Sequence, residues 1–208
     1  MPHTTPESPD HFHAVRFYQD TASLCHIVAA FLGEGLKRGE PALIIATLEQ
    51  RVGIAPALAA DGFDVELFRQ AGFLFELDAA ETLARFMHEG DEPDRHEFSE
   101  VIGGMLQQIA ERRAGRSIRA YGQMVDVLWQ AGAHVAAVRV EVLWNQLAAT
   151  RQFALLCGYS MGNFYQDGAL GEICRQHTHV VSADGETARV LDANGRGDAQ
   201  VVRARSSE

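Results

Sequence analysis

The run Ala42-Leu43-Ile44-Ile45-Ala46-Thr47 decides the fold. Its apolar residues are continuous and do not alternate with polar ones, which is typical of a parallel strand buried on both faces. A helical pattern capped by Asp20 or Thr21 precedes it and runs to about residue 38, with Gly39 as a stop. A second helical pattern follows at about 48–60. The strand therefore lies between two helices, as in a βαβ unit.

The same alternation continues along the chain. Strands are expected at 13–18, 42–47, 72–77, 117–122 and 153–159, and helices at 21–38, 48–60, after Asp78, 94–113, 124–129, 135–147 and 168–180. Strands separated by helix-length segments predict an α/β fold, with three α/β/α layers around a mostly parallel sheet of about five or more strands. Residues 1–11 are expected to be a disordered leader and 12–182 one domain. Residues 183–208 are expected to be a tail, or a hairpin around Asn194-Gly195.

Composition limits the partners. The 208 residues carry a net charge of −10, which argues against nucleic acid and against an anionic membrane surface. No apolar run approaches the roughly 20 residues of a membrane span, and the polar, Pro-rich N-terminus does not resemble a signal peptide. Three cysteines, an odd and sparse number, favour free thiols in a reducing cytoplasm.

Signatures of catalysis are missing. The glycines of Gly33-Glu34-Gly35-Leu36-Lys37-Arg38-Gly39-Glu40 surround the single lysine of the chain, but not in the order of a phosphate-binding loop. The sequence also lacks a nucleophile elbow, a His-Glu-x-x-His motif, a dinucleotide fingerprint and a Cys-x-x-Cys pair. We therefore expect a non-enzyme with no cofactor, whose ligand is not a polyphosphate.

Several blocks together resemble one family. They are His13-Ala14-Val15-Arg16-Phe17-Tyr18, Phe31-Leu32-Gly33-Glu34-Gly35-Leu36 with Gly39-Glu40, Glu81-Thr82-Leu83-Ala84-Arg85-Phe86-Met87, Arg119-Ala120-Tyr121-Gly122-Gln123-Met124-Val125, Glu141-Val142-Leu143-Trp144-Asn145-Gln146-Leu147, Phe153-Ala154-Leu155-Leu156-Cys157-Gly158-Tyr159, and Cys174 with His177 and His179. In order and spacing they resemble the MEDS domain, the sensory domain of methanogens, methylotrophs and dichloromethane-responsive regulators.

The resemblance implies a RecA/KaiC-like fold without the phosphate loop. It also implies a sensor of small molecules, including hydrocarbon derivatives, that works beside histidine kinases or transcription regulators. The family usually has an acidic residue after the glycine of the fourth strand, where this chain has Gln123. If that carboxylate carries a family function, the function is altered here.

Ligands of parallel α/β sheets bind at the carboxyl ends of the strands. The candidate ligand-binding residues at those ends are Tyr18, Thr47, Tyr121, Gln123 and Tyr159. A tyrosine offers an apolar ring and an orienting hydroxyl to a small, largely apolar ligand. The alternative is that the three rings cap the sheet and bury its edge.

Glu141, Trp144 and Asn145 are also candidates, because their i, i+3, i+4 spacing puts them on one helix face. They would form one wall of a ligand site or a partner surface. The alternative is a helix packed by Trp144, with Glu141 paired to an arginine.

A metal site is the less favoured reading of the histidines. His13, Cys174, His177 and His179 supply suitable ligand types, but their spacing fits no standard zinc module. On the favoured reading Cys174 is a core thiol and the last two histidines cap a helix end. Cys157, in a strand, is expected to be an inert buried residue.

Three functions follow from the sequence. The first is a cytoplasmic sensory module that passes a ligand signal to a partner such as a histidine kinase, a response regulator or a sigma-factor control protein. The second is a ligand-free scaffold in a signalling complex, which could be a homodimer. The third is a degenerate nucleotide-binding protein or hydrolase.

Overall fold

The structure is a computed structural model that describes residues 12–88, 92–162 and 170–190. Its main sheet has the strand order β3-β2-β6-β7-β1-β8-β9. The strands are β1 (His13–Tyr18), β2 (Ala42–Ala46), β3 (Leu74–Asp78), β6 (Ile118–Gly122), β7 (Phe153–Ser160), β8 (His179–Val181) and β9 (Thr187–Arg189). Neighbouring strands are parallel except for β8 and β9, which are antiparallel. A separate short ladder joins β4 (Met87–His88) to β5 (Glu92–Pro93).

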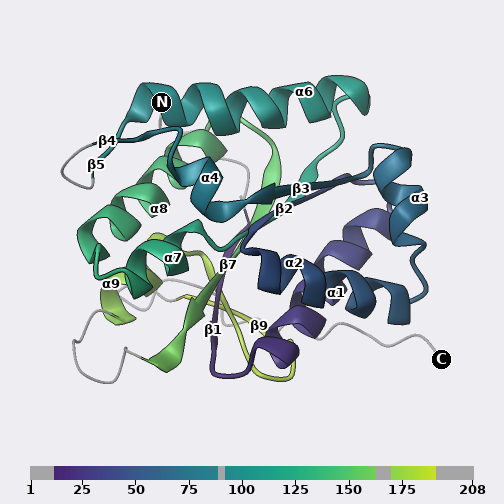
Figure 1. The fold of residues 1–208 in the computed structure, drawn as a ribbon, viewed down its shortest axis with the longest axis horizontal. Coiled ribbons are helices and arrows are strands. Elements are labelled where there is room, and N and C mark those ends of the chain that lie inside the picture. The colour runs from purple at the N-terminus through teal and green to yellow at the C-terminus, as the bar shows by residue number, and fades with distance from the viewer. Residues whose placement is uncertain (1–11, 89–91, 163–169, 191–208) are drawn as a thin grey trace, which may run out of the picture.

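Helices cover both faces of the sheet, with α1 and α2 on one face and α7 and α8 on the other (Figure 1). The helices are α1 (Thr21–Lys37), α2 (Leu48–Ala60), α3 (Val65–Gln70), α4 (Ala79–Leu83), α5 (Arg95–Phe98), the π-helical η1 (Ser99–Gly103), α6 (Gly104–Arg112), α7 (Met124–Gln130), α8 (His134–Ala148) and α9 (Leu170–Gln176). Within the described ranges, no helix has both the length and the apolar character needed to cross a membrane.

Side-chain alternation along the strands divides the core in two. In β2, Ile44 packs toward α1 and α2, whereas Leu43 and Ile45 pack toward the helices of the other face. Every residue of β2 is buried. The continuous apolar run at 42–46 therefore reflects a strand covered on both faces, as predicted.

The predicted α/β fold with a mostly parallel sheet is confirmed. Asp20 caps α1, because its carboxylate accepts hydrogen bonds from the backbone N–H groups of Ala22 and Ser23. The last predicted helix is present, but its predicted end was wrong, since α9 ends at Gln176 and residues 179–181 form a strand. Backbone pairing of β8 with β1 outweighs the local helical pattern there.

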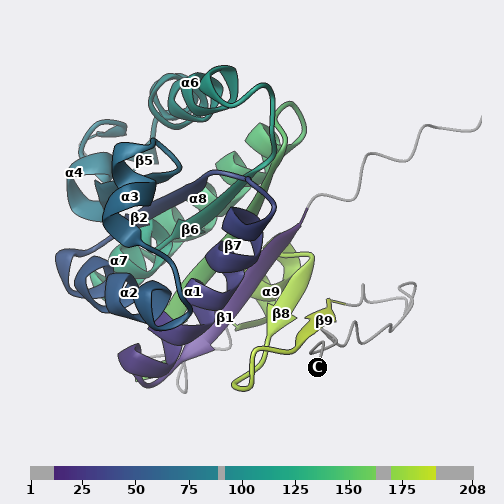
Figure 2. The same cartoon turned by 90° about the vertical axis from the view of Figure 1, so that its right-hand side faces the viewer.

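The structure contains a hairpin that the sequence analysis did not predict. Residues 179–181 and 187–189 pair around Gly185, whose φ of 83° suits glycine. Figure 2 shows β1, β8 and β9 side by side at one edge of the molecule. The predicted turn at Asn194-Gly195 and the predicted leader at 1–11 lie outside the described residues.

Arg119 of β6 forms hydrogen bonds to α1. Its guanidinium donates to the Phe31 carbonyl at 2.8 Å and to the carboxylates of Glu34 and Glu40 at 3.2 and 3.1 Å. Burial alone would raise the pKa of the Glu40 carboxyl, but hydrogen bonds from Arg38 and Arg119 outweigh it and hold that pKa below its ordinary value of 4.5. The folded state therefore favours the ionised form of Glu40.

Replacing Arg119 by Met should lower the free energy of unfolding by about 2 kcal/mol at neutral pH, since charged hydrogen bonds are lost from a site only 15% exposed. Denaturant unfolding measures the change.

A group with a lowered folded pKa stabilises the protein above its unfolded pKa and loses that contribution as the pH falls through the folded value. The stability difference between wild type and Glu40→Gln should accordingly shrink below pH 4.5. A difference that stays constant with pH would contradict this account of Glu40.

Candidate functional site

Tyrosines and amides meet at the carboxyl ends of the strands in a buried hydrogen-bond chain, which we call the strand-end network (Tyr18, Gln50, Tyr121 and Asp126). The Tyr121 hydroxyl donates to Gln50 Oε1 at 2.6 Å, and Gln50 Nε2 donates to the Tyr18 hydroxyl at 3.0 Å. The Tyr18 hydroxyl donates in turn to Asp126 Oδ2 at 2.8 Å. The network thus joins β1, α2, β6 and α7.

Asp126 anchors the end of this network. It is fully buried, and Oδ1 accepts the backbone N–H of Ser160 at 2.9 Å, which brings in the end of β7. Oδ2 also accepts from Gln130 Nε2 at 2.8 Å. Burial, followed by the Asp126 charge, raises the pKa of Tyr18 far above its ordinary value, so this hydroxyl keeps its proton and acts as a donor.

Thr47 and Gln123, two further candidates, bind each other beside the network. Gln123 Oε1 accepts both the backbone N–H and the hydroxyl of Thr47, at 2.8 and 3.0 Å. This contact needs only an acceptor oxygen, which a carboxylate would also supply. The glutamine at this position therefore keeps the structural link between β2 and β6.

Side chains thus fill the strand ends where a ligand pocket was expected. Tyr18 and Gln123 are 6% and 5% exposed, and Tyr121 and Tyr159 are fully buried. In the described part of the chain, a hollow of about 390 Å³ lies next to the network, between α1 and α2. Its lining is mostly apolar and consists of Thr21, Ala22, Cys25, His26, Gly53, Pro56 and Ala57.

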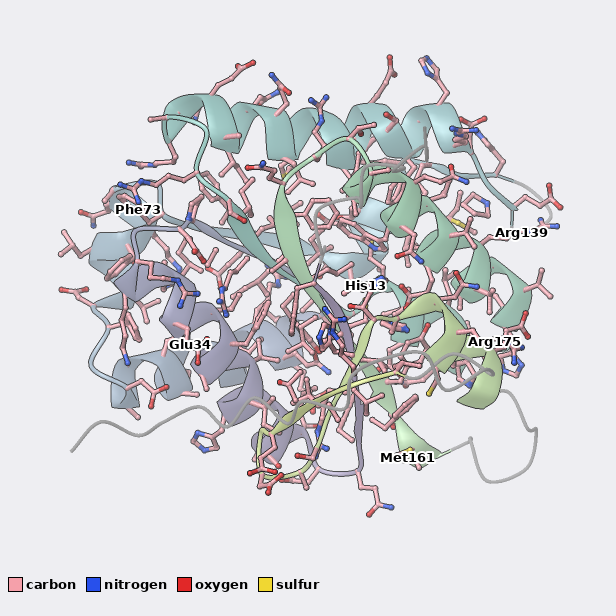
Figure 3. The ribbon with its side chains drawn as sticks, turned by 180° about the vertical axis from the view of Figure 1, so that it is seen from behind. His13, Glu34, Phe73, Arg139, Met161 and Arg175 are labelled. Carbon is pink, nitrogen blue, oxygen red and sulfur yellow. The ribbon has the colours of Figure 1, made fainter. Side chains whose placement is uncertain are left out.

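A second polar cluster lies between the sheet and α8. It consists of His13, Glu141, Cys157 and His177, and we call it the His–Glu–Cys cluster. All four residues are at least 95% buried. One potential ligand atom from each residue lies within 4.8 Å of those of the other three. Figure 3 shows His13 in the interior of the molecule, away from the labelled peripheral residues.

The elements that bring this cluster together are far apart in the sequence. His13 begins β1, Glu141 is in α8, Cys157 is in β7, and His177 directly follows α9. The parallel pairing of β1 with β7 aligns Val15 with Cys157, so His13 and Cys157 project from the same face two positions apart. The sheet thereby places residues 13 and 157 under the same helix.

Neighbouring groups orient the members of the cluster. His13 Nδ1 lies 2.8 Å from Asn145 Oδ1, and Asn145 Nδ2 donates to the Gln176 carbonyl at 2.8 Å. His177 Nδ1 lies 2.7 Å from the carbonyl of Ile173. Glu141 Oε1 accepts the Tyr159 hydroxyl at 2.9 Å. Both rings consequently turn their Nε2 atoms toward the Glu141 carboxylate.

Electrostatics favours an ionised Glu141. Burial alone would raise the pKa of its carboxyl, but His177 and His13 outweigh burial and hold that pKa far below its ordinary value. Burial, followed by the proximity of His177, lowers the pKa of His13. Burial and Glu141 raise the pKa of the Cys157 thiol. The cluster therefore contains a buried carboxylate and a thiol beside it that keeps its proton.

The structure separates the candidates on α8. Glu141 and Asn145 both face the cluster, while Trp144 packs edge-on against Phe98 in the apolar core, with ring centroids 5.4 Å apart. The arginine partner envisaged for Glu141 is replaced by His13 and His177, at 3.2 and 3.3 Å.

Only two of the four residues in the less favoured metal site, His13, Cys174, His177 and His179, come together in the structure. His13 and His177 come together, with ring centroids 4.2 Å apart. His179 instead stacks on Phe12, and Cys174 is a half-buried thiol outside the cluster. Cys157 and Glu141 complete the cluster in place of His179 and Cys174. The sequence places both His13 and Cys157 in predicted strands. This placement could indicate a shared cluster only if the two strands were known to be neighbours.

Fold and sites define a class of protein: an α/β domain with a mostly parallel sheet and two buried polar clusters. Residues 12–178 match the family model described as the methanogen/methylotroph, DcmR sensory domain, MEDS. The match covers most of the chain, so the protein belongs to the MEDS family of sensory domains. No curated protein sequence matches the chain closely enough to count as a relative. The RecA/KaiC-like relationship stays a prediction.

Gly158 makes room for the strand-end network. A Cβ at this position would lie 2.6 Å from the Tyr121 hydroxyl. Gly158→Ala should therefore displace that ring, break its bond to Gln50 and lower the free energy of unfolding by about 1–3 kcal/mol. Gly104→Ala is the control, since a Cβ there meets nothing within 4 Å; in a helix it should be neutral or stabilising. Equal stability of the two variants in denaturant unfolding would show that the network does not need this space.

Proposed function

We propose that the protein is a non-catalytic, cytoplasmic sensory module, which binds a small, largely apolar ligand and signals through a partner protein. Membership of a sensory family supports the signalling role. The observation that carries the finer proposal is the position of α2. This helix borders the hollow, contributes to the strand-end network and exposes apolar side chains to solvent.

Each of these features occupies a different part of α2. Gln50 is 2% exposed and links Tyr121 to Tyr18. Gly53 and Ala57 line the hollow, and a Cβ on Gly53 would lie 2.7 Å from Cys25 Sγ, so α1 and α2 approach closely there. A molecule that enters the hollow would act directly on the spacing of the two helices.

The lining of the hollow defines the ligand class. It is mostly apolar, with few polar groups to bind a charged molecule. A short-chain hydrocarbon derivative without charge fits this chemistry better than a nucleotide does. This replaces the strand-end pocket expected from the sequence with a neighbouring site between α1 and α2.

The relay would be a shift between two arrangements of α2. A ligand changes such an equilibrium only when it binds one arrangement better than the other. Because Gln50 holds α2 to β1 and β6, movement of α2 would require the strand-end network to rearrange. The exposed side chains Leu48 and Val52, one helical turn apart and 65% and 63% exposed, would then change position for a partner such as a kinase or a transcription regulator.

The ligand proposal predicts a loss of binding when the hollow is filled. Ala22 lines the hollow, so Ala22→Phe should weaken binding of short-chain alcohols, ketones or halogenated hydrocarbons at least about tenfold, the effect of losing roughly 1.4 kcal/mol. Ala30→Phe, an exposed substitution on α1 outside the hollow, is the control. Ligand-detected NMR with this panel measures binding. If both variants bind like wild type, the hollow is not the site.

The scaffold hypothesis remains the second candidate, and Leu48 and Val52 favour it, because two exposed apolar residues on one helix face suit a protein contact. Hydrogen exchange separates it from the sensor. A sensor should show altered amide protection in α2 when a ligand from the panel binds. A scaffold should show the same protection with and without every member of the panel.

A further inference from the structure

We infer that the His–Glu–Cys cluster is a metal site, which binds one divalent transition-metal ion, Zn²⁺ first among them, through His13 Nε2, Glu141, Cys157 Sγ and His177 Nε2. The inference does not depend on the ligand proposed for the hollow. It rests on the distances between these atoms, on the orientation of the two imidazoles and on the charge that the cluster contains.

The distances among three of the four ligand atoms match those of a tetrahedral zinc site. Zinc holds nitrogen and oxygen at about 2.0–2.2 Å and sulfur at about 2.3 Å, which places neighbouring ligand atoms roughly 3.3–3.6 Å apart. His13 Nε2 lies 3.2 Å from Glu141 Oε2 and 3.5 Å from Cys157 Sγ. Cys157 Sγ lies 3.6 Å from Glu141 Oε2. These three atoms form one face of the tetrahedron.

His177 supplies the fourth corner. One of its potential ligand atoms lies within 4.8 Å of one from each of the other three residues, and its Nε2 lies 3.3 Å from Glu141 Oε1. This nitrogen is buried and pairs with the Glu141 carboxylate, but the pair lacks the geometry of a hydrogen bond. A buried polar atom without a hydrogen bond is costly. Coordination of a metal ion would satisfy it.

Hydrogen bonds behind the rings fix the tautomer that metal binding requires. The Ile173 carbonyl can only accept, so His177 Nδ1 carries the proton. Asn145 Nδ2 donates to the Gln176 carbonyl, which leaves Oδ1 to accept the Nδ1 proton of His13. In the neutral form, each imidazole therefore turns the lone pair of Nε2 toward the cluster. Metal-bound histidines commonly have such partners on the second nitrogen.

The net charge of the four ligands also fits a divalent cation. Two neutral imidazoles, a Glu141 carboxylate and a Cys157 thiolate sum to −2, which a divalent cation cancels. Binding breaks the S–H bond of Cys157, and its proton leaves to solvent while sulfur donates its electron pair to the metal. The product is a neutral unit in a fully buried place, where an uncompensated charge would be costly.

The donor set selects the metal class. A thiolate and two imidazoles favour zinc or another late first-row ion over Mg²⁺ and Ca²⁺, which prefer oxygen ligands. Four protein ligands form a closed site, as in structural zinc centres. The earlier expectation of no cofactor and this site exclude each other, so metal analysis decides between them.

Cobalt substitution tests the site in the untagged full-length chain. After removal of metal with a chelator, Co²⁺ should bind one per chain and give a thiolate-to-metal charge-transfer absorption, which Zn²⁺ then removes. Cys157→Ser should abolish this absorption and weaken Zn²⁺ binding at least about tenfold. Cys174→Ser, a thiol outside the cluster, should keep both.

Two results would overturn the proposal. One is wild-type protein that binds Co²⁺ without the charge-transfer absorption, or does not bind it, because exposed histidines alone would then explain any uptake. The other is Cys157→Ser that retains wild-type zinc affinity. If Cys157→Ser does not fold, the wild-type cobalt spectrum still decides, since the band requires a thiolate ligand.

Asn145 provides a further test as a positioning residue. Asn145→Ala removes the acceptor for His13 Nδ1 and should weaken Zn²⁺ affinity about 10–100-fold. Asn145→Asp retains an acceptor and should restore much of the affinity. Equal zinc affinities of the Ala variant and the wild type would show that Asn145 does not orient a metal ligand.

Discussion

The buried carboxylate of Glu141 is the constraint on which the assembly of this domain depends. Glu141 lies in α8 with no solvent exposure, and its neighbours come from β1, β7 and the end of α9. A charge in such a place must be compensated, or folding is opposed by its desolvation. The first strand of the described chain and the segment after α9 are thereby held to the same helix.

The two polar systems share strands of one sheet, and the strand-end network also reaches α2 and α7 on its two faces. β1 carries His13 at its start and Tyr18 at its end, so it belongs to both. In β7, Tyr159 donates to Glu141, while the N–H of the next residue, Ser160, donates to Asp126. The His–Glu–Cys cluster and the strand-end network are therefore joined through two neighbouring strands, β1 and β7.

Local patterns were sufficient to predict the fold but not the sites. Continuous apolar strands and capped helices predicted the parallel α/β sheet, because those signals depend on burial and period. The hydrogen bond between Tyr121 and Gln50 joins residues 71 positions apart, and His13 approaches Cys157 across 144 positions. Such contacts depend on strand order, which no single segment encodes. The sequence therefore predicts the burial of Cys157, which the structure confirms, but not its contacts with His13 and Glu141.

X-ray absorption at the zinc edge of the purified protein tests the central claim most directly. The account predicts one sulfur at about 2.3 Å and three nitrogen or oxygen atoms at about 2.0–2.2 Å, with the outer scattering of imidazole rings. A shell of oxygen and nitrogen without sulfur, or protein without bound metal after growth with zinc, would contradict it. Glu141 would then be compensated by protons on the histidines alone.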